Sequence, residues 1–260
     1  MDSPESSLLQ PHDVYPIGHL HQHANTPMLL VCEHAGNAIP SQLGTLGLSP
    51  AELQSHIGWD IGALAVAREL AHNFPGELIY QKYSRLVVDC NRPLGVPDFV
   101  PEVSAGISVP DNVGLSDAQR AQRMREIWQP FSAVIEKTFD DREQRSVPTV
   151  LVCIHSFTPT LNGVDRPWHM GLLFNHDDEL ATVLAHHLRV EAPDTVIGMN
   201  EPYVVADDED HTIPRFGEAR GIPHVLIEIR NDLIRNAAGQ SHWGQVLTRS
   251  LQRCLEELRL

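Results

Sequence analysis

The sequence has 260 residues, of which 42% are hydrophobic and 20% are charged, the composition of an ordinary globular protein. Its 34 acidic and 19 basic residues give a formal net charge of −15, which argues against nucleic acids and anionic membranes as partners, because both carry negative charge. The chain shows no apolar run of the roughly 20 residues that span a bilayer, no secretion signal and no C-x-x-C pair among its four cysteines, so we expect a reduced, cytoplasmic protein.

Strand-like and helix-like patterns alternate along most of the chain. Residues 1–26 are polar and are expected to form a loosely held N-terminal arm. Beyond this arm, short apolar runs predict strands at 28–32, 77–80, 86–88, 149–154, 170–174 and 225–229. Apolar stripes of helical period predict helices at 60–74, 116–139, 178–189 and 243–258, with a kink at Pro130 in the second.

Two segments lack such a period. Residues 93–115 are rich in Pro, Gly and Val and predict a long loop, and the acidic stretch 207–210 predicts a solvated loop. The alternation elsewhere predicts one α/β domain over residues 27–260, with three layers and helices on both faces of a mixed, mostly parallel central sheet.

Reactive side chains follow several of the predicted strands. In open α/β sheets, sites form beyond the carboxyl ends of the strands. Residues 33–37, 89–92 and 155–156 lie at such ends, and Glu228 lies inside an apolar strand that Arg230 follows. A lone His or Glu at such a place is more often structural, so the prediction depends on their combination. Asp60 begins a predicted helix, where it either caps the helix or ligates a metal, and spacing alone leaves both roles open.

These residue types are those of a hydrolytic metal site. Two His and one carboxylate with an open fourth position form a known catalytic zinc arrangement, in which the metal acidifies a bound water. A further carboxylate moves the proton from the water to the leaving nitrogen. Glu228 suits this second role, because its apolar strand should raise its pKa. Arginines would stabilise the oxyanion and bind an acidic substrate.

Seven blocks of the sequence carry a family resemblance. They are C-E-H-A-G-N-A-I-P at 32–40, H-I-G-W-D-I-G-A at 56–63, S-R-L-V-V-D-C-N-R-P at 84–93, I-H-S-F-T-P at 154–159, R-P-W at 166–168, N-E-P-Y at 200–203 and E-I-R-N-D-L at 228–233. In this order the blocks resemble the N-formylglutamate amidohydrolase family over about residues 28–235. The resemblance implies a zinc-dependent amide hydrolase with a phosphorylase/hydrolase-like fold and one Zn²⁺ per chain.

The resemblance also implies roles for individual residues. His34 and His155 look like metal ligands and Glu228 looks like the catalytic carboxylate. Asn91 and Arg92, which follow Arg85, are similar to the residues with which aspartoacylases and carboxypeptidases hold a substrate carboxylate.

The third metal ligand departs from one pattern and matches another. Carboxypeptidases and aspartoacylases carry a Glu three residues after the first His, where this chain has Asn37. The peptidoglycan amidases use an acid at the start of the following helix, and Asp60 looks like that residue. Asp60 is therefore the predicted third ligand and Glu33 the alternative. The side chains of Glu33 and His34 would project oppositely if the strand continued through them, which favours Asp60.

The resulting hypothesis is hydrolysis of an N-acyl amino acid, with N-formyl-L-glutamate giving L-glutamate and formate, a reaction of histidine degradation. Zinc would be held by His34, Asp60 and His155, with Glu228 and Arg85 as catalytic residues. Asn91, Arg92, Ser156, Arg166 and Arg230 would contact a small acidic substrate. Two alternatives for the function are left open: the same metal site could act on another N-acyl amino acid or a peptide amide, or the protein could be a non-catalytic carboxylate-binding module. A homo-oligomer is also left open.

Overall fold

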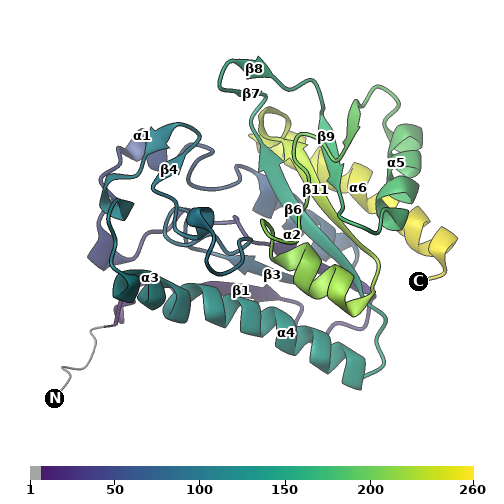
Figure 1. Ribbon diagram of the computed structural model, residues 1–260. Helices are drawn as coiled ribbons and strands as arrows, with labels where there is room; N and C mark the ends of the chain where they lie inside the picture. The colour runs from purple at the N-terminus through teal and green to yellow at the C-terminus, as the bar shows by residue number, and fades with distance from the viewer. Residues whose placement is uncertain (1–6) are drawn as a thin grey trace.

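The computed structural model describes residues 7–260, which are built around a seven-stranded sheet with the spatial order β1-β3-β2-β6-β11-β9-β10 (Figure 1). The strands are β1 (Ile17–Leu20), β2 (Met28–Cys32), β3 (Glu77–Gln81), β6 (Val150–Phe157), β9 (Met170–Leu173), β10 (Ile197–Met199) and β11 (His224–Arg230). β3, β2, β6 and β11 run parallel. β1 is antiparallel to β3, and β9, which pairs in parallel with β10, is antiparallel to β11. The predicted mixed, mostly parallel sheet is confirmed.

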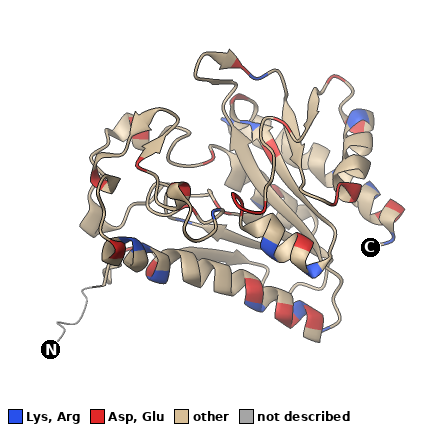
Figure 2. Ribbon diagram, in the orientation of Figure 1, with Lys and Arg blue, Asp and Glu red and all other residues tan. Residues whose placement is uncertain are grey.

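Helices cover both faces of the sheet and complete three layers. The principal helices are α2 (Ala63–Asn73), α4 (Gln129–Gln144), α5 (Glu179–Glu191) and α6 (Ala237–Leu258). The strands are buried on both faces, so successive side chains alternate between two cores. One core includes α2, α5 and α6, and the other includes α4. Figure 2 shows that charged residues lie mainly on helices and loops, whereas the central strands are nearly free of them. Among residues 7–260, no helix combines the length and apolar character that a membrane crossing needs.

Short elements complete the fold. They are the helices α1 (Pro50–Leu53) and α3 (Asp117–Arg123) and the two-stranded hairpins β4 (Val103–Ser104) with β5 (Ile107–Ser108) and β7 (Thr160–Leu161) with β8 (Val164–Asp165). The first hairpin lies within 93–115, so this predicted loop contains some regular structure.

The helix predicted at 116–139 contains an irregularity just before its proline. Ser116 caps α3 by accepting a hydrogen bond from the N–H of Gln119, as expected of a capping box. A π-helical turn over Met124–Trp128 then separates α3 from α4, and Pro130 is the second residue of α4. A proline lacks an N–H and its ring crowds the carbonyl four residues earlier, so a widened turn at this point accommodates it.

The strand predicted at 86–88 is wrong, because Leu86 and Val87 lie in a turn and Val88 belongs to no strand. Leu86, Val87 and Val88 are buried in the same core as α4. A short buried run has the same composition whether or not it pairs with a neighbouring strand, so the sequence pattern alone could not separate the two cases.

The N-terminal residues are more ordered than a loosely held arm. Residues 1–6 lie outside the described part of the chain, but Ile17–Leu20 forms β1 and pairs with β3. Before this strand, the carboxylate of Glu126 accepts hydrogen bonds from the N–H groups of Leu8 (2.8 Å) and Leu9 (2.9 Å). The prediction of a loose polar arm is therefore wrong for these residues. A four-residue edge strand is defined by its partner, which the composition of a mostly polar segment does not reveal.

A buried ion pair joins β3 to α4. Nη1 of Arg142 lies 2.9 Å from Oε2 of Glu77, and both side chains are at most 1% exposed. The same guanidinium donates to the carbonyl oxygens of Thr26 (2.6 Å) and Pro148 (3.0 Å) and to the hydroxyl of Thr149 (2.9 Å). The charge of Arg142 is therefore fully compensated only while Glu77 is ionised.

Glu77→Gln is expected to lower the free energy of unfolding by about 3–5 kcal/mol at pH 7, because it leaves the buried Arg142 without its counter-charge. Burial raises the pKa of Glu77, but hydrogen bonds from His19, His23 and Arg142 outweigh it and lower the pKa. With the folded-state pKa below the unfolded value of about 4.3, the stabilisation is present above that pH and is lost as the pH falls through the folded-state pKa. Urea unfolding of both proteins should therefore differ at neutral pH and converge in acid. The exposed control Glu143→Gln should change little, and an equal deficit at all pH values would contradict the prediction.

Candidate active site

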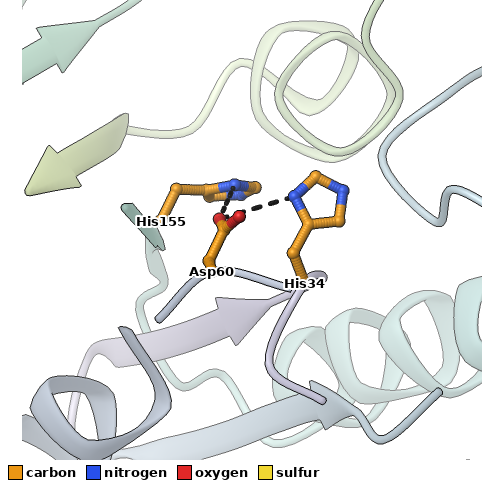
Figure 3. A group of neighbouring side chains, drawn as sticks. All are labelled: His34, Asp60 and His155. Carbon is orange, nitrogen blue, oxygen red and sulfur yellow. Dashed lines mark ion pairs between the residues drawn. The ribbon is translucent and has the colours of Figure 1, made fainter. Parts of the chain in front are cut away.

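His34, Asp60 and His155 converge at one end of the sheet. His34 follows β2, His155 lies in β6 and Asp60 precedes α2. Oδ2 of Asp60 lies 3.0 Å from Nδ1 of His155 and 3.5 Å from Nδ1 of His34, so the carboxylate lies between the two rings (Figure 3). The ring centroids are 4.8 Å apart and the rings are nearly perpendicular, at 87°. All three residues are buried, and each offers a ligand atom within 4.8 Å of the others.

Backbone contacts hold Asp60 in this position. Its N–H donates to the carbonyl of His34 (2.9 Å), and its Oδ2 accepts from the N–H of Ser156 (3.2 Å). Two residues later, Gly62 is the N-cap residue of α2 and has a left-handed φ of 84°. A Cβ at Gly62 would collide with the carbonyl oxygen of Ile234, so only glycine permits this close approach of the chain. The turn between strand and helix therefore fixes the direction of the carboxylate.

A carboxylate behind each ring sets the orientation of both histidines. Nε2 of His34 lies 2.7 Å from Oδ1 of Asp89, and Nε2 of His155 lies 2.9 Å from Oε2 of Glu33. An Nε2–H that donates to such a carboxylate leaves Nδ1 as the free acceptor, which is how second-layer acids prepare histidines for a metal. Glu33, the alternative third ligand, thus lies on the far side of His155 from Asp60.

The charge and hydrogen bonding of this cluster fit a divalent metal ion. Burial lowers the pKa of His155, but the carboxylates of Glu33 and Asp60 outweigh it and raise the pKa well above its ordinary value. The negative charge that favours an imidazolium also favours a cation. Nδ1 of His34 is buried, and no hydrogen-bond partner for it is found among residues 7–260. Two imidazole nitrogens and a carboxylate oxygen are suitable ligands for such an ion.

Glu228 stands beside this group. It lies in β11 directly opposite His155 of β6 in the parallel ladder, so the two side chains project from the same face. Its side chain is buried, and Oε2 has no hydrogen-bond partner within the described chain. Burial raises the pKa of Glu228 to about 7, although the positive charge of His155 acts in the opposite direction. A carboxyl group with this pKa can both accept and release a proton near neutral pH.

A cavity of about 340 Å³ opens on these residues and contains most of the predicted substrate contacts. Arg85, Asn91, Arg92 and Ser156 line it. The guanidinium of Arg85 donates to Asp89 (2.7 Å) and remains 27% exposed. The hydroxyl of Ser156 is engaged, because it donates to the carbonyl of residue 61 (3.0 Å).

The two remaining arginines lie differently. Arg166 is not among the residues that line the cavity, but it donates to the hydroxyl of Tyr203 (2.9 Å), which does line it. Arg230 pairs with Asp232 (2.9 Å) and also lies outside the lining. The structure therefore brings Arg166 to the cavity only through a neighbour and does not bring Arg230 there.

Sequence reasoning assigned no role to several lining residues. His56, Glu209 and Asp210 line the cavity, and Asp210 forms an ion pair with Arg92 (3.0 Å). The stretch 207–210 is thus not simply a solvated loop, because its last residue turns inward. A run of four acids gives no sign of which one has a buried partner.

Comparisons with known proteins agree with this geometry. The family model described as N-formylglutamate amidohydrolase matches residues 26–235. A gene product of Agrobacterium tumefaciens has a crystal structure that is similar over 97% of this chain and 100% of its own, with 36% identity and a TM-score of 0.93. The structure of N-formylglutamate amidohydrolase from Ralstonia eutropha shares the fold, with 18% identity, a TM-score of 0.68 and coverage of 95% of this chain and 99% of that one. No curated protein matches the chain. The match spans most of the sequence, including His34, Asp60 and His155, and the chain is a hydrolase of amides that belongs to the N-formylglutamate amidohydrolase family.

Proposed function

We propose that the protein is a zinc-dependent enzyme that hydrolyses N-formyl-L-glutamate to L-glutamate and formate, as a cytoplasmic step of histidine degradation. The observation that carries the proposal is the meeting of His34, Asp60 and His155 beside the carboxylate of Glu228, whose Oε2 has no hydrogen-bond partner among residues 7–260. Family membership supports the class of reaction.

Three side chains would hold the zinc ion. His34 and His155 would each bind through Nδ1, because Nε2 of each ring faces a carboxylate, and Asp60 would bind through the oxygen that lies between them. When bound, zinc polarises the formyl carbonyl and acidifies the attacking water. Arg85 and the carboxylate of Asp89 flank the site and keep its charge balanced.

Glu228 would move the proton during hydrolysis. Its carboxylate takes a proton from the water as the oxygen attacks the formyl carbon, and it delivers this proton to the nitrogen as the C–N bond breaks. Arg85 would stabilise the negative charge that develops on the carbonyl oxygen, because its guanidinium is anchored by Asp89 and still reaches the cavity. The products are formate and a free amine.

The cavity suits a small dianionic substrate. Arg92 lines the cavity, and Asn91 and Ser156 line it too. Arg166 supports Tyr203 at the same wall and supplies further positive charge. N-formylglutamate carries two carboxylates, whose charge the arginines would offset and to which the Asn91 amide would donate. Arg230 is paired with Asp232 outside the lining, so we assign it no substrate contact.

The activity is tested by loading the purified protein with zinc and measuring formate released from N-formyl-L-glutamate. A parallel panel of N-formyl, N-acetyl and peptide substrates tests the choice of substrate. Release of formate at a higher kcat/KM than for any other member supports the proposal. If another member of the panel were hydrolysed with a higher kcat/KM, the proposed metal site would stand and the proposed substrate would change to that compound. Binding without turnover would indicate a carboxylate-binding module.

The pH dependence of kcat/KM tests Glu228 as the proton acceptor. Burial raises the pKa of Glu228 to about 7, and a cation beside the carboxylate would lower this pKa by favouring the charged form. Only the ionised carboxylate accepts a proton, so kcat/KM is expected to rise with pH along an acidic limb centred below pH 7. A profile without this limb, measured under conditions in which zinc stays bound, would contradict the assignment.

A further inference from the structure

An internal carboxylate occupies the residues that we assign to the substrate carboxylate. Oδ1 of Asp210 lies 3.0 Å from Nη1 of Arg92 and accepts a hydrogen bond from Nδ2 of Asn91 (3.0 Å). Its Oδ2 accepts from the N–H of Ala206 (3.1 Å). The Asp210 side chain is 12% exposed and lines the same cavity. The carboxylate of Asp210 thus makes the contacts that a bound substrate carboxylate would make.

The surrounding contacts show which part of this arrangement can exchange. The side-chain oxygen of Asn91 accepts from the N–H of Thr212 (3.1 Å), and its backbone carbonyl accepts from the N–H of His211 (3.0 Å). These two bonds anchor the segment after Asp210 independently of its carboxylate. Nη1 of Arg92 also donates to the carbonyl of Glu209 (2.7 Å). Only the Asp210 carboxylate itself therefore has to move for another carboxylate to take its place at Nη1 of Arg92 and Nδ2 of Asn91.

We infer that Asp210 is a specificity-determining residue that competes with the substrate carboxylate for Arg92 and Asn91. The inference rests on the proposed function for the position of that carboxylate. A tethered competitor acts at a high effective concentration. A ligand that binds through one carboxylate alone forms contacts with Arg92 that only replace those lost by Asp210, so its net gain in binding free energy is small. A ligand held at further points, such as a dianion with an acyl group at the metal, can still displace it. Asp210 would thus lower the affinity of the site for every ligand whose carboxylate takes this position, and only ligands with further contacts would bind well.

Asp210→Asn tests this competition, with Asp208→Asn as the matched control. Asp208 lies in the same loop and is exposed, so its replacement removes the same charge without changing the contacts to Arg92. The zinc-loaded wild type and both variants are titrated calorimetrically with glutarate. KM and kcat for N-formyl-L-glutamate are measured in parallel.

We expect Asp210→Asn to bind glutarate about three- to tenfold more tightly and to lower KM by a similar factor, because one partly exposed ion pair no longer has to be broken. The kcat should stay unchanged, and Asp208→Asn should bind glutarate as the wild type does. Unchanged, weaker or undetectable glutarate binding in a cooperatively melting Asp210→Asn would overturn the inference. If that variant does not fold, Asp210→Ser, whose hydroxyl can still accept from Ala206, replaces it.

The two proposals fail separately. Tighter glutarate binding by Asp210→Asn without formate release from any of the proteins would refute N-formylglutamate as the substrate and keep the competition. Formate release by all three proteins without a change in glutarate binding would support N-formylglutamate as the substrate and refute the competition by Asp210.

Discussion

Glu228→Gln is expected to lower kcat by about 10²- to 10⁴-fold while the protein still binds one zinc ion per chain. Gln has nearly the same shape as Glu, but its amide cannot take a proton from water and return it to the leaving nitrogen. The carboxylate is buried beside His155, and its Oε2 has no hydrogen-bond partner among residues 7–260. Replacing this oxygen therefore breaks no hydrogen bond within the described structure. Steady-state formate release and zinc content of the same samples provide the measurement.

The control for this variant repeats the chemical change elsewhere. Glu256→Gln alters an exposed residue of α6, away from the cavity, and should leave kcat and zinc content unaltered. If Glu228→Gln kept its activity, Glu228 would be removed from proton transfer. If it lost zinc as well as activity, Glu228 would act as a ligand instead.

The second large effect concerns the third ligand. Asp60→Ala is expected to weaken zinc binding by a factor on the order of 10³ or more, because it removes one of three protein ligands. Glu33→Gln should weaken binding by only about 10- to 100-fold, because the amide oxygen of the new side chain could still accept a hydrogen bond from Nε2 of His155 and only the charge behind the ring is lost. Competition with a chromophoric chelator measures both affinities in the absence of substrate.

Asp89→Asn supplies the internal standard for this comparison. Asp89 faces Nε2 of His34 as Glu33 faces Nε2 of His155, so the two variants should lose zinc affinity to a similar extent. A larger loss in Glu33→Gln than in Asp60→Ala would make Glu33 the ligand and Asp60 the support. Thermal melting in the absence of metal establishes that each variant is folded.

The central strands and the first long helix could be predicted because their patterns depend on burial alone. The segments around Leu30, Val152 and Ile227 are continuous apolar runs, and burial on both faces of a parallel sheet requires this composition. β1 and β10 were not predicted, because four- and three-residue strands at the sheet edges are specified by their neighbours more than by their own residues. At 86–88 a strand was predicted where the structure has none, because a buried segment that pairs with no strand has the same apolar pattern.

The convergence of His34, Asp60, His155 and Glu228 was predictable for a different reason. The carboxyl ends of parallel strands meet at one edge of a sheet. The family resemblance selected His34, His155 and Glu228 from these strands or their ends, and Asp60 from the segment that leads into α2. The functions of Glu33 and Asp89 behind the rings were not predictable, because they depend on which ring nitrogen faces which acid. The inward turn of Asp210 depends on its hydrogen bonds to residues more than a hundred positions earlier.

The ladder pairing of Glu228 with His155 has a consequence for how this protein can change over evolutionary time. A single inserted or deleted residue within β11 would exchange Glu228 for one of its isoleucine neighbours beside His155, because alternate residues of a strand face opposite sides. Loops around the cavity can lengthen or shorten and so alter which ligands are accepted. The spacing between Glu228 and His155 is instead set by the backbone pairing of β11 with β6, and it can be inherited unchanged by descendants with quite different substrates.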